Sequence, residues 1–230
     1  MKTLGIIQPG RIGDIILCLP IAKYYADRGY KVTWPIFSEY CGMFAEVVDY
    51  VHFIPITSDI YKCVSDAKIW LLHNDLILDL AATFPNSTCT DAYVKSGDGL
   101  GDIKADQFKY LTAEVPFKEK WNLSIKRNNN KEHQLRKQYI KQSNYVVSCL
   151  TTSQGPLNFK VDHGRRQLVE MNTRHSIFDW IGILIDAEVL VLSNSSVSNL
   201  VEMLNLSNKK YLLPRKDGRL PVLKNQWTII

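Results

Sequence analysis

The sequence has no long apolar run, and no stretch approaches the roughly 18 apolar residues that a membrane-spanning helix needs. It also has no recognisable signal peptide, because its first apolar run is short and is interrupted by Pro9, Gly10 and Arg11. Its five cysteines are widely spread without a CxxC pair, which argues against a disulfide framework or a zinc site. These absences predict a cytoplasmic protein and leave peripheral docking at the inner face of a membrane open.

A strong charge of either sign is also absent. The formal net charge of +5 over 230 residues suits an anionic ligand such as a nucleotide and does not single out nucleic acid, so no nucleic-acid partner is expected. The basic residues are densest at residues 118–141, where eight Lys or Arg accompany two Glu. This segment would attract an anionic membrane surface, although a solvated linker and helix face is its ordinary interpretation.

Short apolar runs alternate with helical spacing along the chain, which is typical of α/β proteins with parallel sheets. In the first half, strands are expected at residues 3–8, 31–35 and 51–55, with further short apolar runs at residues 68–72 and 76–80. Helices are expected at residues 14–27, ended by Gly29, and at residues 106–113. Residues 96–106 read as a loop rich in Gly and Asp.

A second α/β block begins at Asn144. It follows residues 126–131, which contain no apolar residue and read as a linker, and a polar helix at residues 132–142. The expected later strands are residues 145–150, 167–171, 188–192 and 210–213, and the expected helices are residues 176–186 and 199–204. We therefore expect an N-terminal domain at residues 1–125, a linker and helix at 126–143 and a C-terminal domain at 144–230, with a cleft between their sheets.

Glycines and charged residues gather directly after the first expected strand. Gly10 and Gly13 allow a ligand to approach the backbone closely, and the helix that follows offers unpaired N–H groups and partial positive charge. Asp14 has two interpretations, a helix cap or a carboxylate base at the carboxyl end of a sheet. Arg11 is either a solvated loop residue or a contact to a phosphate or an acidic sugar. The G-x-x-G spacing does not match a dinucleotide fingerprint.

Small hydroxyl and amide side chains gather after the strand at residues 188–192. The turn from Asn194 to Asn199 contains three serines and leads into a helix. Backbone N–H groups and serine hydroxyls there would hold a pyrophosphate, and simple helix capping is the alternative.

These two segments resemble glycosyltransferase family 9, the heptosyltransferase-like enzymes. The opening GIIQPGRIGDIILCLPIAKYYADRGYKVTWPI has the family's strand, Gly-Asp turn, helix with a Leu-Pro pair and second strand with Trp. The stretch SIFDWIGILIDAEVLVLSNSSVSNLVEML resembles the family's donor-site segment without a gap, and residues 115–121 resemble the segment before the linker. The resemblance implies a GT-B fold, in which two Rossmann-like domains face each other across a cleft and the C-terminal domain of this chain is shortened.

The resemblance also implies an inverting glycosyl transfer in glycan biosynthesis, without metal or cofactor, from a nucleotide-sugar co-substrate to a glycan or lipid-linked saccharide acceptor. Asp14 matches the catalytic base, and Gly10, Arg11, Gly13 and Asp106 would contact the acceptor or a phosphate. The donor site would comprise Thr151, Lys160, His175, Asn194, Ser195, Ser196 and Asn199, with Arg165 and Arg166 as alternatives to Lys160.

This sequence departs from the family pattern at two donor positions and in length. Asn194 stands where the family usually has Asp, and Asn199 stands where it usually has His. No helix is evident between Leu150 and Gln167, so one βα unit is expected to be missing. Two further hypotheses therefore stay open: a GT-B-shaped nucleotide binder that has lost catalysis, and another doubly wound enzyme such as a nucleotide-sugar epimerase.

Overall fold

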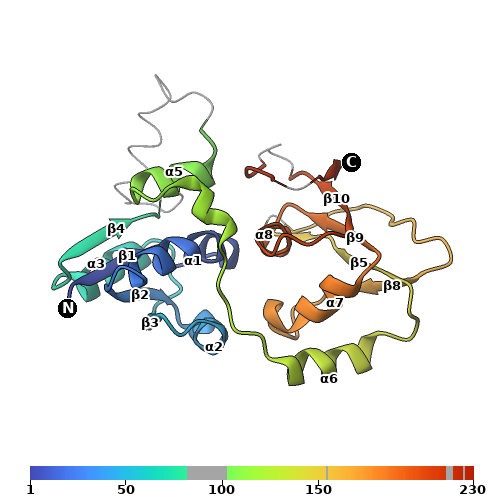
Figure 1. Ribbon diagram of the computed structural model, residues 1–230, viewed down its shortest axis with the longest axis horizontal. Helices are drawn as coiled ribbons and strands as arrows, with labels where there is room; N and C mark the ends of the chain where they lie inside the picture. Colours follow the sequence, from blue (N-terminus) through green and yellow to red (C-terminus); the bar gives the residue numbers. More distant parts are fainter. Residues whose placement is uncertain (82–102, 154, 216–219, 225) are drawn as a thin grey trace. The chain divides into compact units, whose positions relative to one another are not determined.

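The computed structural model describes residues 1–81, 103–153, 155–215, 220–224 and 226–230. These residues form two compact units, Met1–Lys126 and Arg127–Ile230 (Figure 1). Most of the predicted Gly- and Asp-rich loop, residues 96–102, lies outside the described residues. Each unit is an α/β structure built on its own parallel sheet, as the alternating pattern predicted.

The first unit contains a four-stranded parallel sheet with the strand order β3-β2-β1-β4. Its strands are β1 (Thr3–Ile7), β2 (Lys31–Phe37), β3 (Val51–Ile56) and β4 (Leu76–Asp79). Its helices are α1 (Ile12–Ala26), α2 (Ser38–Val47), α3 (Cys63–Leu71), α5 (Ala105–Thr112) and the 3-10 helix η2 (Phe117–Trp121). The predicted strands and the two predicted helices of this half are confirmed, with α1 beginning two residues earlier than expected.

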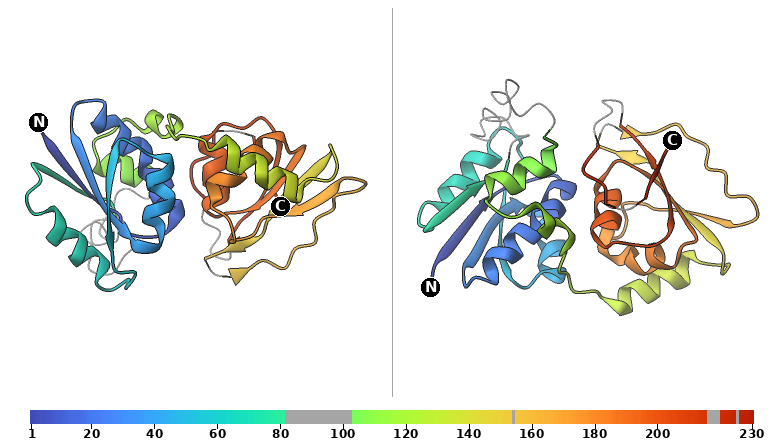
Figure 2. Two further views of the ribbon diagram at one scale, coloured as in Figure 1. Left: turned by 90° about the horizontal axis from the view of Figure 1, so that it is seen from below. Right: turned by 45° about the horizontal axis from the view of Figure 1, so that its top comes forward.

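Helices cover both faces of this sheet (Figure 2). Gly5 and Ile7 of β1 face Leu71 of α3, so the alternating residues Leu4 and Ile6 point to the opposite face, and all of these aliphatic side chains are buried. Helix α1 packs with α5 and η2, and every residue from Ile15 to Ala22 is buried. This continuous burial explains why the first helix is apolar nearly all round.

Two helices of this unit were not predicted. The apolar run at residues 68–72 lies mainly in α3, where Val64, Ala67 and Leu71 recur at helical spacing and are buried. Ile69 and Trp70 face outwards and are more than half exposed. Helix α2 was not predicted, because only Phe44 and Val47 of its ten residues are buried, which leaves a weak apolar stripe.

The second unit has a five-stranded parallel sheet with the order β11-β10-β9-β5-β8. The strands are β5 (Tyr145–Cys149), β8 (Gln167–Glu170), β9 (Val189–Ser193), β10 (Lys209–Leu213) and β11 (Thr228–Ile229), with a separate short pair β6 (Thr151–Thr152) and β7 (Gly155–Pro156). The helices are α6 (Asn129–Tyr139), η3 (Ile177–Trp180), α7 (Ile181–Asp186) and α8 (Ser196–Met203). Apart from residue 154, which is not described, the segment between β5 and β8 contains no helix, as expected.

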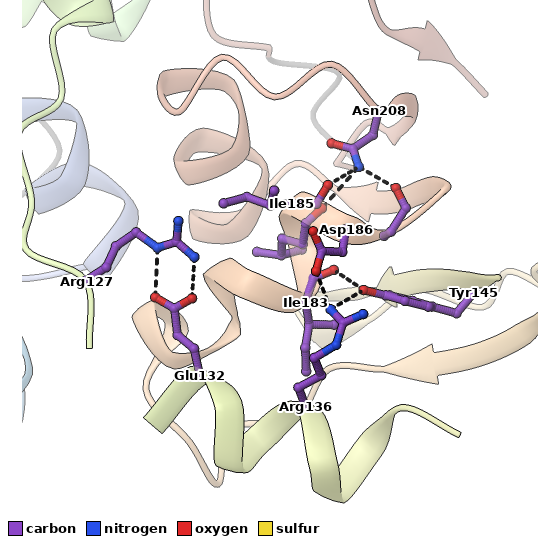
Figure 3. Close-up of polar contacts among 10 residues, drawn as sticks. Arg127, Glu132, Arg136, Tyr145, Ile183, Ile185, Asp186 and Asn208 are labelled. Carbon is purple, nitrogen blue, oxygen red and sulfur yellow. Dashed lines mark hydrogen bonds and ion pairs between the residues drawn. The ribbon is translucent and has the colours of Figure 1, made fainter. Parts of the chain in front are cut away.

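Helix α6 belongs to the second unit because its side chains are fixed there (Figure 3). Arg127, which lies directly before α6, donates from Nε to Oε1 of Glu132 in the first turn of the helix at 2.9 Å. Arg136 pairs with Asp186 at the end of α7, and Tyr145 Oη donates to the Ile183 carbonyl at 3.0 Å. The unit boundary therefore falls at Lys126, and most of the expected linker segment is part of the second unit or of α6.

Candidate functional site

Each sheet has one point where the strand order reverses, and ligands of open α/β sheets bind outside the carboxyl ends of the strands at such points. In the first unit this point lies between β1 and β4. In the second unit it lies between β5 and β9. The turn that contains Asp14 follows β1, and the turn from Asn194 to Asn199 follows β9, so both predicted constellations lie at a switch point of their own sheet.

Asp14 lies in the first turn of α1 and does not cap the helix. Arg11 is the N-cap residue, and the Asp14 backbone N–H donates to the Arg11 carbonyl at 2.9 Å. The Asp14 side chain is 19% exposed, and its Oδ1 lies 3.7 Å from Lys109 Nζ. Within the described part of the chain, its carboxylate accepts no hydrogen bond, so the first helix does not need it as a cap.

A buried polar network lies beside Asp14. Lys109 of α5 is 1% exposed and donates to Gln8 Oε1 at 2.6 Å and to the Leu80 carbonyl at 2.7 Å. Gln8 is fully buried, and its Nε2 donates to the Gly10 carbonyl at 3.1 Å. Because Gln8 follows β1 and Leu80 follows β4, Lys109 bridges the two strand ends that form the switch point.

The turn before Asp14 has a tightly constrained backbone. A Cβ atom at Gly10 would lie 2.4 Å from the Phe37 ring, so no larger residue fits there without displacing β2 side chains. Arg11 has φ 63° and ψ 106°, a backbone conformation that is costly for a non-glycine residue. Its side chain is exposed, and Gly13 is partly buried in the first turn of α1. Strain of this kind is common at ligand-binding turns.

In the second unit, a serine side chain connects the ends of β5 and β9. Ser193 Oγ at the end of β9 donates to the Thr151 carbonyl after β5 at 3.0 Å, and the Thr151 side chain is exposed. Asn194 is 9% exposed, and its backbone N–H donates to the Leu213 carbonyl at 2.9 Å. Burial raises the pKa of the nearby Cys149 thiol, so this thiol is protonated at neutral pH and is not a nucleophile there.

Helix α8 begins inside this cluster. Ser195 is its N-cap residue, and Ser198 Oγ accepts from the Ser195 N–H at 3.0 Å and donates to the Ser195 carbonyl at 2.9 Å. Ser196 and Asn199 lie in the first turn with partly exposed side chains. The structure thus brings Thr151, Asn194 and the start of α8 together without any charged side chain among them.

The predicted donor-site cations differ in position; they are Lys160 and its alternatives Arg165 and Arg166. Lys160 is exposed in the segment between β7 and β8. Arg166 lies at the amino end of β8, where it donates to Glu188 Oε1 at 3.0 Å and to the His163 carbonyl at 3.0 Å. Since ligands of open α/β sheets bind at the carboxyl ends of the strands, the position of Arg166 argues against a donor contact. The roles of Lys160, Arg165 and Arg166 stay predictions.

His175 lies against aromatic side chains of the second unit. Its ring meets Tyr139 edge-on at a centroid distance of 5.9 Å and Trp180 at 6.4 Å. Tyr139 in turn packs against Trp180 at 4.9 Å. These contacts explain the position of His175 by packing, and its donor role stays a prediction.

Asp106, predicted to contact the acceptor, is 2% exposed in the first turn of α5. Its Oδ2 lies 2.5 Å from Lys120 Nζ, and both side chains are buried. Because this carboxylate is almost completely buried, it offers an acceptor very little surface to contact, which argues against a place for Asp106 in the site.

The sequence analysis missed Lys109 and Gln8. Lys109 lies on the inner face of α5, with the neighbouring Phe108 and Tyr110 also buried. A lysine in a short helix ordinarily indicates a solvated position, so only its place beside buried aromatics offered a signal.

The basic segment at residues 118–141 does not form one charged surface. Lys120 is buried against Asp106, and Lys126 pairs with Asp49 at 2.8 Å. Arg127 and Arg136 pair with acidic residues of the second unit. Four of its eight cations are thus held in ion pairs, which weakens the argument for membrane attraction.

A separate hollow of about 360 Å³ lies near the carboxyl-terminal end of α1, distant along the helix from Asp14. Its charged lining is already paired within the protein: Lys23 contacts Asp27, and Asn122 Nδ2 donates to Glu119 Oε2 at 2.6 Å. It therefore offers few unpaired groups to a ligand.

Two further features, a metal site and a membrane span, are absent from the described residues. No group of three or more His, Cys, Asp or Glu side chains is placed to hold a metal ion in these parts of the chain. None of the helices in the same parts combines the length and the apolar composition needed to cross a bilayer.

Comparison with solved structures identifies the fold. The chain is similar to a glycosyl transferase of family 9 from Veillonella parvula DSM 2008, with a TM-score of 0.60 and 10% identity over 92% of this chain and 80% of that one. It is also similar to the E. coli ADP-heptose lps heptosyltransferase II, with a TM-score of 0.58 and 12% identity over 100% and 90% of the two chains.

A third similar structure is E. coli heptosyltransferase WaaC with ADP-2-deoxy-2-fluoro heptose, with a TM-score of 0.54 and 13% identity over 100% of this chain and 93% of that one. No protein-family model matches the sequence, and no curated protein matches it. The chain therefore has the GT-B-type fold of family 9 glycosyltransferases, with two Rossmann-like units, which confirms the predicted fold class.

Proposed function

We propose that this protein is an inverting glycosyltransferase that moves a sugar from a nucleotide-sugar donor to a hydroxyl of a glycan or lipid-linked saccharide. The first unit would receive the acceptor and supply the base, and the second unit would hold the donor. The observation that carries the proposal is the Asp14 carboxylate at the switch point of the first sheet, 19% exposed and without a capping role.

In the proposed reaction, the acceptor oxygen attacks the anomeric carbon of the donor sugar. The new C–O bond forms as the bond from that carbon to the diphosphate oxygen breaks, and the electron pair of this bond leaves with the nucleoside diphosphate. Asp14 takes the proton of the attacking hydroxyl, which contributes roughly 10²–10⁴-fold to the rate. A single displacement inverts the configuration at the anomeric carbon.

Neutral hydrogen-bond donors of the second unit would stabilise the departing diphosphate. The start of α8 presents backbone N–H groups and the positive end of a helix dipole, with Ser195, Ser196 and Asn199 around it. Lys160 is the cation that we assign to the diphosphate. We propose that the reaction needs no metal, because these groups act on the charge that develops on the leaving group. The cytosol, where nucleotide sugars are available, is the proposed location.

The similar E. coli structures support a nucleotide-sugar donor, since one is an ADP-heptose heptosyltransferase and the other contains ADP-2-deoxy-2-fluoro heptose. The test is to incubate the protein with a panel of nucleotide sugars that includes ADP-heptose, together with candidate acceptors, and to measure released nucleoside diphosphate. Asp14→Ala should lower the rate of nucleoside diphosphate release by roughly 10²–10⁴-fold, whereas binding of the nucleotide sugar should still be detectable. Release that EDTA abolishes would contradict the metal-independent mechanism.

A second candidate function is a nucleotide-sugar binding protein without catalysis. It is favoured by Asn194 and Asn199, which have hydrogen-bonding capacity but cannot supply a negative charge or accept a proton as Asp or His does. Binding of a nucleotide sugar without release, unchanged by Asp14→Ala, would support this candidate over the enzyme.

A further inference from the structure

Two lysines of the first unit are almost completely buried, but only one has a carboxylate at hydrogen-bonding distance. Lys109 and Lys120 are each 1% exposed. Lys120 Nζ lies 2.5 Å from Asp106 Oδ2. The hydrogen-bond partners of Lys109 in the described chain are two neutral oxygens, the Gln8 amide oxygen and the Leu80 carbonyl.

A buried ammonium group is costly unless an opposite charge compensates it. The carboxylate that pairs with Lys109 in the described chain is Asp14, whose Oδ1 lies 3.7 Å from Nζ. This separation is too long for a hydrogen bond but short enough for strong attraction where water is excluded. The exposed fractions of 1% and 19% make the cation inaccessible and the carboxylate reachable.

The Gln8 side chain and the Leu80 carbonyl hold Lys109 in its position. An ammonium group has three N–H donors, and Lys109 uses two of them on groups that directly follow β1 and β4. Gln8 also holds the Gly10 carbonyl of the turn that leads to Asp14. Movement of Lys109 towards the carboxylate would therefore break bonds that tie the ends of β1 and β4 together.

We propose that Lys109 is the positioning residue for Asp14: a fixed, buried positive charge that attracts the carboxylate and holds it in place without hydrogen-bonding to it. A short hydrogen bond would occupy a lone pair of one carboxylate oxygen, whereas a charge at 3.7 Å leaves both oxygens able to accept the acceptor proton. After the proton is transferred, Lys109 keeps its two neutral partners. This proposal rests on the proposed function and adds a second residue, Lys109, that positions the catalytic base Asp14.

The first experiment tests the pair without reference to activity. Asp14→Asn is introduced into the wild type and into the Lys109→Met and Lys120→Met variants, and the urea midpoint of each protein is measured. Asp14→Asn should lower the midpoint in the wild type and equally in Lys120→Met, because the charge of Lys109 loses its partner. In Lys109→Met it should leave the midpoint unchanged or raise it. An equal shift in all three backgrounds would overturn the proposal.

The second experiment measures nucleoside diphosphate release with the best donor and acceptor pair. Lys109→Met should lower kcat by about 10- to 100-fold with KM changed less than about threefold, because a displaced base affects the transition state and not substrate binding. Lys120→Met is the matched control, since it removes an equally buried lysine from the same unit; its kcat per folded molecule should stay within about threefold of the wild type. Lys109→Gln, which keeps an N–H donor without the charge, should lose kcat as Met does and serves if Met prevents folding.

The outcomes separate the two claims. If the Asp14→Asn shift in urea midpoint depends on Lys109 but kcat of Lys109→Met is unchanged, the positioning role is overturned and Lys109 is a structural residue only. Equal losses of kcat in Lys109→Met and Lys120→Met would also overturn it. If the wild type releases no nucleotide from any donor, the proposed function fails and the catalytic role of Lys109 fails with it, while the midpoints still show whether the charge pair exists.

Discussion

The β1–α1 turn of the first unit and the β9–α8 turn of the second unit occupy the same place in their sheets but differ in chemistry. Both follow a central strand at a switch point. The first turn presents a carboxylate beside a buried ammonium group and includes a residue with positive φ. The second presents serine side chains that hydrogen-bond to the backbone, with Asn194 and Asn199 in the same turn. One fold element thus supports either charge or neutral hydrogen bonding, and the side chains after the strand decide which.

The comparison fits a division of labour between reaction and binding. Moving a proton requires a group that changes charge, which the first turn has in Asp14. Holding a diphosphate requires donors and a helix dipole, which the second turn has without an acid that would repel the ligand. Variants that alter one turn should therefore leave the task of the other largely intact.

The largest expected effect on stability is at Gly10, where the first turn has no room for a side chain. Gly10→Ala would place a Cβ atom 2.4 Å from the Phe37 ring, and we expect the free energy of unfolding to fall by about 1–3 kcal/mol, as for other overpacked sites. Urea denaturation measures the change. Proposed catalysis should fall as well, because the turn that carries Asp14 must shift.

Gly42→Ala is the matched control for Gly10→Ala. Gly42 lies within α2, and a Cβ atom there would meet nothing within 4 Å. Alanine should therefore stabilise the protein by about 0.5–1 kcal/mol through helix propensity. A destabilisation of the same size at both positions would show that the Phe37 contact is not the cause.

A smaller effect is expected in the second turn, at Ser198. Its hydroxyl is buried and makes two hydrogen bonds to the Ser195 backbone. Ser198→Ala should lower the free energy of unfolding by about 1 kcal/mol, because an N–H group at the start of α8 loses its partner. It should also weaken nucleotide-sugar binding, measured by calorimetry, whereas Asp14→Ala should not.

Ser196→Ala provides the control within the same turn. Ser196 is partly exposed and has no hydrogen bond from its side chain to the described residues, so we expect a stability change within about 0.5 kcal/mol. Equal losses at Ser196 and Ser198 would contradict the role assigned to the Ser198 hydroxyl.

The smallest effect concerns the buried lysine of the second unit. Lys210 is 5% exposed and donates to the Leu206 carbonyl, and burial lowers its pKa while Glu202 opposes the shift. The folded protein therefore releases this proton at lower pH than the unfolded chain does. Between the folded pKa and the ordinary value of about 10.4, the unfolded chain binds more protons, so the stability contribution of Lys210 rises with pH.

The measurement is the free energy of unfolding of wild type and Lys210→Met between about pH 8 and about pH 10.5. The difference should move in favour of the wild type as pH rises. Lys209→Met is the control, since it removes an exposed lysine from the same strand, and its pH profile is the reference against which the Lys210→Met profile is compared. A constant difference for Lys210→Met would contradict the lowered pKa.

Local sequence patterns predicted much of the fold, for reasons visible in particular elements. Strands such as β1 and β9 are continuous apolar runs because both faces of their sheets are covered. The helix expected at residues 176–186 is present as η3 and α7, and the Ser176 side chain accepts from the Phe178 N–H at its start. Helix α2 escaped prediction because only two of its side chains, those of Phe44 and Val47, are buried, so its apolar stripe is weak.

The candidate site was predicted in part. Gly10, Asp14 and the serine-rich turn could be found because each directly follows an apolar strand and precedes a helix. The burial of Asp106 could not be predicted, because nothing in the local sequence shows that Lys120 lies 2.5 Å away and that both side chains are buried. Lys109 was missed because its partners, Gln8 and Leu80, are 101 and 29 residues away along the chain.

The sequence by itself determined which segments become strands, which turns follow them, and that small, flexible residues occur in those turns, because these properties depend on neighbouring residues and hydrophobic period. Only the tertiary structure decided which charges are buried and which carboxylate remains reachable. Burial and charge pairing depend on segments brought together from distant parts of the chain, and at the β1–α1 turn that packing joins a lysine of α5 to the carboxylate of α1.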